Sequence, residues 1–257
     1  MSLVIEPLSK KPELEPLLWE DELMSSWPEF MLNDPFANLY YGAARFERYY
    51  DFMLIAYDDQ SPKQILARAF SVPFCLGDDF RRSTLPDGGW DSIVHWADMD
   101  YLLERKPNAV SALEITVSSQ AKGQGLSAKI LQAMRNNVKR LGFNDLYAPI
   151  RPNQKHLEPD TAIEDYAYRV REDGLPADPW LRVHLRVGGK IVKMAPYSMV
   201  IANTLEAWRN WTGLPFDRSG ACVVPHALVP VNVSVEHNHA VYVEPNVWIH
   251  HRLDENT

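Results

Sequence analysis

The chain of 257 residues has few cysteines, no long apolar run and no excess of positive charge. Its two cysteines, Cys75 and Cys222, are too few for a disulfide scaffold and do not have the spacing of metal ligands. No run of about 18 apolar residues is present, so we expect no transmembrane helix. The first 20 residues contain acids and prolines where a secretory signal needs an unbroken apolar stretch. These absences predict a reduced, cytoplasmic protein with no membrane partner.

The charge balance excludes a second class of partner. The sequence has 26 Lys and Arg against 34 Asp and Glu, a net charge of −8, which argues against a broad nucleic-acid-binding surface. A local basic pocket for a small anion remains compatible with this balance. Hydrophobic residues make up 46% and charged residues 23%, as in soluble globular proteins. At roughly 150 residues per domain, the length fits one elaborated domain or two small ones.

A strand–turn–helix–strand unit occupies the middle of the sequence. Ala109–Val117 has the composition of a strand, and the glycine-rich turn Gln120–Gly125 follows it. Leu126–Leu141 carries apolar residues every three or four positions and ends at Gly142, which predicts an amphipathic helix with a glycine cap. Asp145–Ile150 is a second strand. The unit indicates an α/β fold.

The flanking segments add mainly β-structure. Phe52–Tyr57 and Gln64–Phe74 are apolar, β-prone and separated by good turn residues, which predicts a hairpin. Further expected elements are a strand over Leu3–Leu8, two short helices within Glu13–Leu32, a helix over Asn38–Tyr50, a helix near Ile93–Glu104, and C-terminal strands over Gly189–Ala195, Ala221–Val224, Val229–Val235 and Ala240–Val243.

The glycine-rich turn has the properties of an anion site. Gly123 and Gly125 permit positive φ and remove side chains that would keep a ligand from the backbone. The helix that begins here presents its first free N–H groups to the same place, and Lys122 and Lys129 add positive charge. The alternative is a turn that only connects strand and helix. The sequence lacks the P-loop pattern, and Ala128 replaces the third glycine of a dinucleotide-binding motif.

Two motifs together resemble those of the GCN5-related N-acetyltransferase (GNAT) superfamily. Gln120-x-x-Gly123-x-Gly125 matches the R/Q-x-x-G-x-G/A loop that holds the acyl-CoA pyrophosphate in that family. Leu181–Val192 resembles the family's later short helix and strand, with His184 where a tyrosine is common. The resemblance covers about Phe52–Pro196, with long insertions at Gly77–Asn108 and Pro152–Asp178. A narrower resemblance, carried by Asp178–His184 and Glu244–Trp248, is to GNAT-like loading domains of polyketide synthases.

The resemblance implies a fold and a reaction. The fold is a GNAT-like mixed twisted sheet with helices on both faces, extended by C-terminal strands. We expect a single domain, with a core at about 52–196 and an extension at 197–257. The expected reaction is transfer of an acetyl group from acetyl-CoA, or of another short acyl group, to an amine by direct attack. Two alternatives are S-acyl transfer or decarboxylation on a carrier-protein phosphopantetheine thioester, and a non-catalytic acyl-CoA-binding module.

The resemblance also implies roles for individual residues. It places the general acid for the leaving thiolate at His184, whose unperturbed pKa near 6.5 suits donation at neutral pH. Glu114 could serve as general base, although a charge on the exposed face of a half-buried strand is the commoner interpretation. A backbone N–H at the end of the strand would polarise the thioester carbonyl. The expected acyl-CoA contacts are Val117, Gln120, Ala121, Lys122, Gly123, Gln124, Gly125, Leu126 and Ser127.

Other chemically capable residues have simpler interpretations. Tyr166 and Tyr168 could act as acids, but packing is favoured. His237 and His239 lack a third ligand at a diagnostic spacing, so we expect a turn between two strands and no metal. The pair His250–His251 is expected to be solvated. The acceptor is a small molecule or a carrier protein, and a homodimer remains open.

Overall fold

The structure, a computed structural model, describes residues 2–24, 27–77 and 81–253. Within these residues a 9-stranded sheet has the order β1-β2-β3-β4-β5-β9-β8-β7, with β6 paired to the other edge of β9. The strands are β1 (Leu3–Pro7), β2 (Met53–Asp58), β3 (Ser61–Phe74), β4 (Ala109–Val117), β5 (Asp145–Ile150), β6 (Lys190–Asn203), β7 (Gly220–Cys222), β8 (Val231–Ser234) and β9 (His239–Arg252). The α-helices are α1 (Asp21–Met24), α2 (Ala37–Tyr41), α3 (Ala43–Phe46), α4 (Gly89–Leu102), α5 (Leu126–Arg140), α6 (Ile163–Ala167), α7 (Pro179–Arg186) and α8 (Leu205–Thr212).

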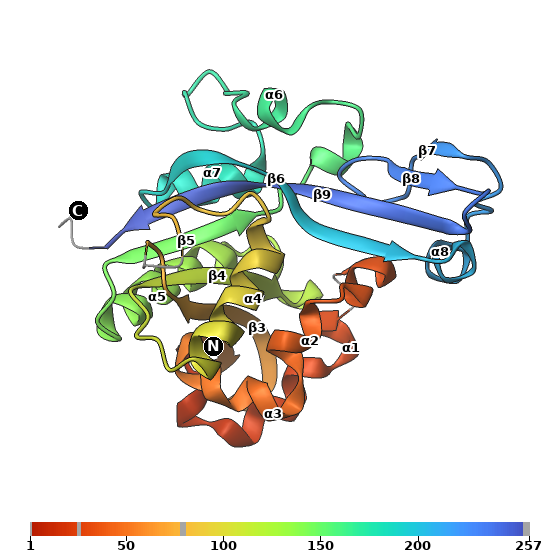
Figure 1. The fold of residues 1–257 in the computed structure, drawn as a ribbon. Helices are drawn as coiled ribbons and strands as arrows, with labels where there is room; N and C mark the ends of the chain where they lie inside the picture. The colour runs from red at the N-terminus through yellow and green to blue at the C-terminus, as the bar shows by residue number, and fades with distance from the viewer. Residues whose placement is uncertain (1, 25–26, 78–80, 254–257) are drawn as a thin grey trace.

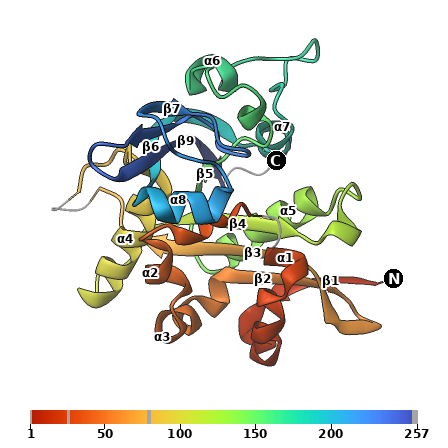
Figure 2. The ribbon, with the colours of Figure 1, turned by 90° about the vertical axis from the view of Figure 1, so that its right-hand side faces the viewer.

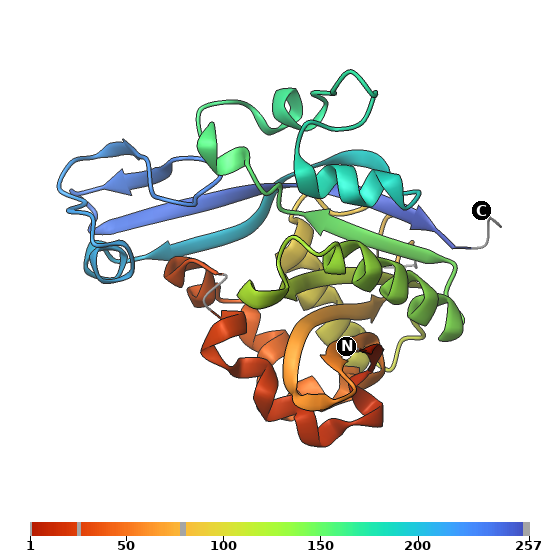
Figure 3. The ribbon, with the colours of Figure 1, turned by 180° about the vertical axis from the view of Figure 1, so that it is seen from behind.

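Helices cover both faces of the sheet, as predicted. Helix α4 lies in front of the strands in Figure 1, whereas α5 and α7 lie in front of them in the opposite view of Figure 3. On the α5 side, Ile130, Met134 and Val138 join a core with β-strand residues such as Val110. On the α4 side, the core holds the aromatic residues of the N-terminal segment. The mixed α/β fold predicted from the sequence is confirmed.

The strand–turn–helix–strand unit is also confirmed. Helix α5 begins at Leu126 and buries Met134 and Val138, while Lys129 and Lys139 are exposed. Gly142 has a φ of +92°, which suits a residue just beyond a helix end. The hairpin of β2 and β3 is present as well. In the part of the chain that the structure describes, no helix is long and apolar enough to cross a membrane.

The N-terminal helices differ from the prediction. The segment expected to form two helices within Glu13–Leu32 forms 3-10 turns at Pro12–Trp19 and Glu29–Asn33 around the short α1, with residues 25–26 outside the described chain. The helix expected over Asn38–Tyr50 is divided into α2, α3 and a 3-10 turn. Gly42 has extended backbone angles, φ −63° and ψ 129°, that interrupt the helix. Helix α4 begins four residues before the expected Ile93.

The C-terminal strands are much longer than predicted. Strand β6 continues past Pro196 because a register irregularity between Ala195 and Met199 accommodates that residue. Strand β9 runs to Arg252 and pairs with β5, so residues 197–252 of the expected extension contribute to the same sheet. With β7, β8 and α8, the end of β6 and the beginning of β9 form an arm that extends from the body (Figures 1 and 3; seen end-on in Figure 2).

Strands β4 and β5 diverge, and this divergence positions the site. Their parallel pairing is limited to Val110–Leu146 and Ser111–Tyr147 in the described residues. Beyond Ser111, β4 continues beside β3, whereas β5 follows β9. The later half of β4 therefore has an open edge.

Candidate active site

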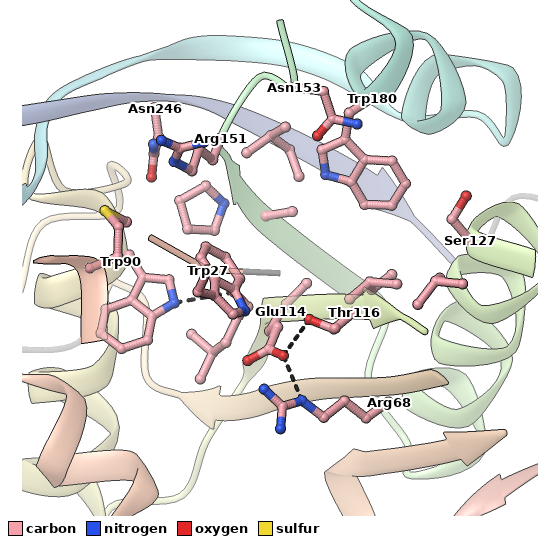
Figure 4. A pocket seen from close by; sticks show the side chains of 18 of the residues that line it. Trp27, Arg68, Trp90, Glu114, Thr116, Ser127, Arg151, Asn153, Trp180 and Asn246 are labelled. Atoms are coloured by element: carbon pink, nitrogen blue, oxygen red, sulfur yellow. Dashed lines mark hydrogen bonds and ion pairs between the residues drawn. The ribbon is translucent and has the colours of Figure 1, made fainter. Parts of the chain in front are cut away.

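A cavity of about 720 Å³ lies along the open edge of β4. It runs from the N-terminus of α5 to the N-terminal segment, α4 and β9. In Figure 4, Ser127 and Trp180 lie on one side of the cavity, Trp90 and Asn246 lie on the other, and Glu114 lies between them. The cavity therefore has two ends, with the carboxylate of Glu114 between them.

The glycine-rich turn forms one end of the cavity. Gly123 and Gly125 have φ of +79° and +71°, and apart from their chain neighbours no heavy atom of the described residues lies within 4 Å of the position that a Cβ would take on either. The first free N–H groups of α5 are at the same place, so the turn fits the diphosphate of an acyl-CoA substrate. Of the predicted contacts, the cavity is lined by Val117, Ala121, Lys122, Gly123, Gly125, Leu126 and Ser127.

Gln120 and Gln124 have a different position from the other predicted contacts. Both are exposed and do not line the cavity. The Gln120 side chain accepts a hydrogen bond from Gln64 Nε2 at 2.9 Å, and Gln124 Nε2 donates to the Gln120 carbonyl at 3.0 Å. The Gln120 side chain therefore links the turn to β3, and the Gln124 side chain forms a hydrogen bond within the turn.

The backbone at the end of β4 offers a donor to the cavity. Ser118 N–H donates to the Leu66 carbonyl on β3 at 2.9 Å. Because successive N–H groups of a strand point to opposite edges, the N–H of Val117 points away from β3, toward the gap left by β5. This geometry suits a donor to a thioester carbonyl.

Glu114 is buried, and the expectation of an exposed strand face is wrong. The N-terminal segment covers this face of β4, so the side chain is only 7% exposed. Its carboxylate accepts hydrogen bonds from Arg68 Nε at 2.7 Å, Thr116 Oγ1 at 2.6 Å and Tyr41 Oη at 2.9 Å. Figure 4 shows the first two contacts at the centre of the cavity. Neither Arg68 nor Tyr41 was singled out from the sequence, since only the fold brings them to Glu114.

His184 lines the cavity but is 1% exposed, and its ring contacts Trp180 and His251. Its Nδ1 lies 2.9 Å from His251 Nε2, and its Nε2 is buried without a partner in the described residues. Burial, followed by the neighbouring His251, lowers the pKa of His184 well below its usual value. The premise of an imidazole that titrates near pH 6.5 is therefore wrong, because the ring is desolvated and neutral at pH 7.

His251 corrects another expectation. It is fully buried, not solvated, and burial lowers its pKa to about 3. His250 is partly buried and lies 2.7 Å from a carboxylate oxygen of Asp145. The long strand β9, which the sequence prediction ended at Val243, is the reason that both residues are held in the sheet.

The other end of the cavity is acidic. Glu244 on β9 is fully buried and accepts hydrogen bonds from Arg151 Nε at 2.9 Å and Tyr242 Oη at 2.8 Å. Asp34 also lines the cavity and interacts with Asp91, which is at the start of α4. Burial and the mutual repulsion of the carboxyls raise the pKa of Asp91 to about 9. Asp34 and Asp91 stand in no motif, and Glu244 begins the Glu244–Trp248 segment of the narrower resemblance, which assigned it no role.

The remaining candidates lie elsewhere. Tyr166 is buried and donates to Asp178 Oδ2 at 2.9 Å, Tyr168 is 52% exposed, and neither lines the cavity. His237 lies in the expected turn between β8 and β9, and His239 begins β9. Among the described residues, no group of three or more His, Cys, Asp or Glu could hold a metal ion.

Comparison with known proteins identifies one relative of nearly the same length. No family model matches the chain. It is 32% identical to an arginine N-acetyltransferase, avaD, of Aspergillus versicolor over 276 residues, which cover 97% of this chain and 93% of that protein.

Two solved structures have a similar fold. The GNAT-like loading domain of CurA from Lyngbya majuscula aligns with a TM-score of 0.56 at 14% identity, covering 100% of both chains. The GphF GNAT-like decarboxylase, solved with isobutyryl-CoA, aligns with a TM-score of 0.54 at 12% identity, covering 98% of this chain and 100% of that one. At these identities, the similarity concerns the fold.

Proposed function

The chain belongs to the GNAT superfamily and is an acyltransferase, and from this premise we propose that it transfers the acetyl group of acetyl-CoA to a nitrogen of a small cationic acceptor. The relative from Aspergillus versicolor, an arginine N-acetyltransferase, favours a nitrogen acceptor over a carrier-protein thiol and supports an acceptor of the arginine type. The carrier-protein and non-catalytic alternatives are not needed to account for this relationship.

One observation carries the proposal. A single cavity connects the glycine-rich turn before α5 with an acidic end, and Glu114 lies between the two. Acetyl-CoA, as a substrate, would place its diphosphate at the positive end of α5. A cationic acceptor would approach from the acidic end. The two substrates would then meet beside the end of β4, which favours direct attack without a covalent enzyme intermediate.

We assign Glu114 and the Val117 N–H to the acyl-transfer step. The acceptor nitrogen, once deprotonated, attacks the thioester carbon, and the C–S bond breaks as the N–C bond forms. The Val117 N–H donates to the carbonyl oxygen, on which negative charge develops. Glu114 receives the proton that the nitrogen loses, directly or through a water molecule.

We assign His184 to the leaving thiolate, as a neutral donor. If His251 Nε2–H donates to His184 Nδ1, the proton of His184 is on Nε2, the atom left without a partner beside the cavity. This N–H can donate a hydrogen bond to the developing thiolate without a change of charge on the ring. The thiolate then takes its proton from water. The location proposed for this chemistry is the cytoplasm, in agreement with the absence of a disulfide at Cys75 and Cys222 in the described residues.

An acceptor panel tests the function. Purified protein would be incubated with acetyl-CoA and L-arginine, agmatine, alkylamines or a carrier-protein thiol, and free CoA release and the product mass would be measured. We expect acetylated nitrogen products from cationic acceptors. Turnover only with the carrier protein or with malonyl-CoA would contradict the amine assignment.

The same assay tests Glu114. In Glu114→Gln, the loss of a general base should lower kcat by about 10²–10⁴-fold with little change in KM for acetyl-CoA. Thr116→Val, which removes one hydrogen bond to the same carboxylate, serves as the matched control and should lower kcat much less. Equal effects of the two substitutions would exclude the proposed role as base.

A further inference from the structure

The acidic residues that line the cavity are not equally neutralised. Glu114 pairs with Arg68, with Nε and Oε1 2.7 Å apart, and Glu244 pairs with Arg151 at 2.9 Å. Asp34 is 3% exposed and has no ion pair with a Lys or Arg among the described residues. A buried carboxylate without a cationic partner costs free energy, so its position in the cavity wall needs an explanation.

Asp34 and Asp91 form a carboxyl pair whose side chains hydrogen-bond to each other. Asp34 Oδ1 accepts the Phe36 N–H at 2.8 Å, and Asp91 Oδ2 accepts the Val200 N–H at 3.0 Å. The other oxygen of each, Asp34 Oδ2 and Asp91 Oδ1, is buried without a donor in the described part of the chain. The backbone bonds fix both carboxyl groups, and their remaining oxygens have no donor among the described residues other than a proton that the pair shares.

The raised pKa values of Asp34 and Asp91 are those expected of two carboxyl groups that have no cation beside them. Burial, followed by interactions with neighbouring carboxyls, raises the pKa of Asp34 to about 6 and that of Asp91 to about 9. Glu244 contributes to both shifts, although Arg151 and Tyr242 donate to its Oε2 and Asn246 donates to its Oε1. Without a ligand, the pair therefore retains a proton at neutral pH. A cation in the cavity would favour the ionised form of both residues.

The walls next to the pair suit a flat cation. Trp90 directly precedes Asp91, and its ring stacks on Tyr41 with an interplanar angle of 18°. Trp27 and Trp90 both border the cavity in Figure 4. Aromatic faces attract organic cations, and a guanidinium can both stack on a ring and donate two parallel hydrogen bonds.

We propose that Asp34 and Asp91 form a subsite that binds a guanidinium group of the acceptor at the end of the cavity opposite α5. The inference rests on the proposed function only in treating the bound molecule as the acceptor. Of the pair, Asp34 lines the cavity, so a guanidinium would donate to it and would displace the proton that it shares with Asp91. The subsite would orient the acceptor so that its nucleophilic nitrogen is directed toward Glu114, and it would reject neutral analogues by leaving Asp34 unpaired.

Equilibrium binding tests the subsite without catalysis. Calorimetry and tryptophan fluorescence would measure the affinity of the CoA-saturated protein for butylguanidinium, for its neutral isostere butylurea and for butylammonium. We expect wild type to bind butylguanidinium best and to bind it more tightly at pH 7.5 than at pH 5.5, as Asp34 ionises. Asp34→Asn and Asp91→Asn should each weaken this binding by about 10- to 100-fold, the cost of losing a charge-assisted hydrogen bond.

The matched control is Asp98→Asn. Asp98 is another buried acid on α4, but it pairs with Arg45 and Arg48 and does not line the cavity. This variant should bind butylguanidinium as wild type does, and all variants should keep the affinity for acetyl-CoA within about threefold of wild type, which also shows that they are folded. Equal affinity for butylurea and butylguanidinium, a preference for butylammonium, or unchanged binding in both Asn variants of the pair would overturn the subsite.

The two proposals fail in distinguishable ways. If butylguanidinium binds through Asp34 but no acceptor is acetylated, the subsite stands and the proposed function fails. If acceptors are acetylated but wild type and Asp34→Asn show the same ratio of kcat/KM for L-arginine over citrulline, the proposed function stands and the subsite fails.

Discussion

At the scale of single residues, the environment of a side chain decides which chemistry it can perform. His184 was placed at the thiolate by its position in a motif, and the structure does put it in the cavity wall. However, the ring packs against Trp180 and His251, and the low pKa that results removes the imidazolium form. The role that we propose is therefore that of a neutral donor through Nε2, which has no protein partner in the described residues.

A pair of substitutions at His184 separates a neutral donor from an acid that titrates. His184→Gln can place an amide N–H near the position of Nε2, whereas His184→Met fills similar space without a donor. We expect His184→Met to lower kcat by about 10- to 100-fold, as for a lost hydrogen bond to a charged group, and His184→Gln to recover most of this loss. Neither should change the affinity for acetyl-CoA.

The pH–rate profile shows whether His184 acts as a neutral donor or as an acid that titrates. A neutral donor gives no kinetic limb near pH 6.5, so the profiles of wild type and His184→Gln should have the same shape. If wild type shows a limb near pH 6.5 that both variants lose, His184 is an imidazolium acid and the structural assignment is wrong.

The sequence predicted those residues whose role is local. Gly123 and Gly125 were found because a turn before a helix is contiguous in the chain, and the structure gives both a positive φ. Asp34 and Asp91 were missed because they are 57 positions apart in the sequence and meet only when the N-terminal segment packs against α4. Glu114 was found, but its burial depends on Arg68 and Tyr41, which come from separate elements.

At the scale of elements, helices and strands with a local sequence pattern were predicted well, and those that depend on pairing with distant parts of the chain were not. Helix α5 has regular apolar spacing and was predicted to within one residue. Strands β6 and β9 were predicted too short, because Pro196, Pro245 and Asn246 are poor strand formers. Tertiary pairing overrides that low propensity, because β6 and β9 pair with each other along most of their length. The cavity depends on β9, so its acidic end could not be predicted from local pattern.

The N-terminus of α5 can be tested with two matched glycines. Gly125 and Gly213 have φ of +71° and +70°, and each adjoins a helix. Apart from chain neighbours, no heavy atom of the described residues lies within 4 Å of the position that a Cβ would take on either glycine. Gly125→Glu and Gly213→Glu therefore incur a similar backbone strain, about 1–2 kcal/mol. Only Gly125→Glu adds a negative charge beside the expected diphosphate, and it should weaken acetyl-CoA binding by about 100-fold or more.

Calorimetry with acetyl-CoA on both variants provides the measurement, with thermal unfolding to confirm equal destabilisation. Gly213→Glu should bind as wild type does. A folded Gly125→Glu protein with unchanged affinity would show that the turn only connects strand and helix.

At the scale of the whole molecule, two buried titratable pairs give stability opposite dependences on pH. His184 and His251 are neutral when folded and have lowered pKa values, so the unfolded chain binds more protons below pH 6.5 and stability falls as the pH decreases through that value. Asp34 and Asp91 have raised pKa values, so the folded chain retains protons that the unfolded chain releases above about pH 4. Their contribution to the unfolding free energy therefore decreases as the pH rises. The decrease ends near pH 6 for Asp34 and near pH 9 for Asp91, where each releases its proton in the folded chain.

The two windows overlap below pH 6.5, but between pH 7 and 9 Asp91 is the only one of these four residues that contributes, so a comparison with Asp91→Asn in that range isolates its effect. We expect the unfolding free energy of wild type, measured with urea, to fall by up to about 1.4 kcal/mol per pH unit there. In Asp91→Asn the amide cannot release a proton, so this slope should largely disappear, whereas Asp98→Asn should keep it. A wild-type slope that Asp91→Asn leaves unchanged would mean that Asp91 is already ionised at pH 7, and the pair would then carry its full negative charge before any cation arrives. Addition of butylguanidinium should itself flatten the wild-type slope, because a bound cation stabilises the ionised pair and removes the proton that unfolding would otherwise release.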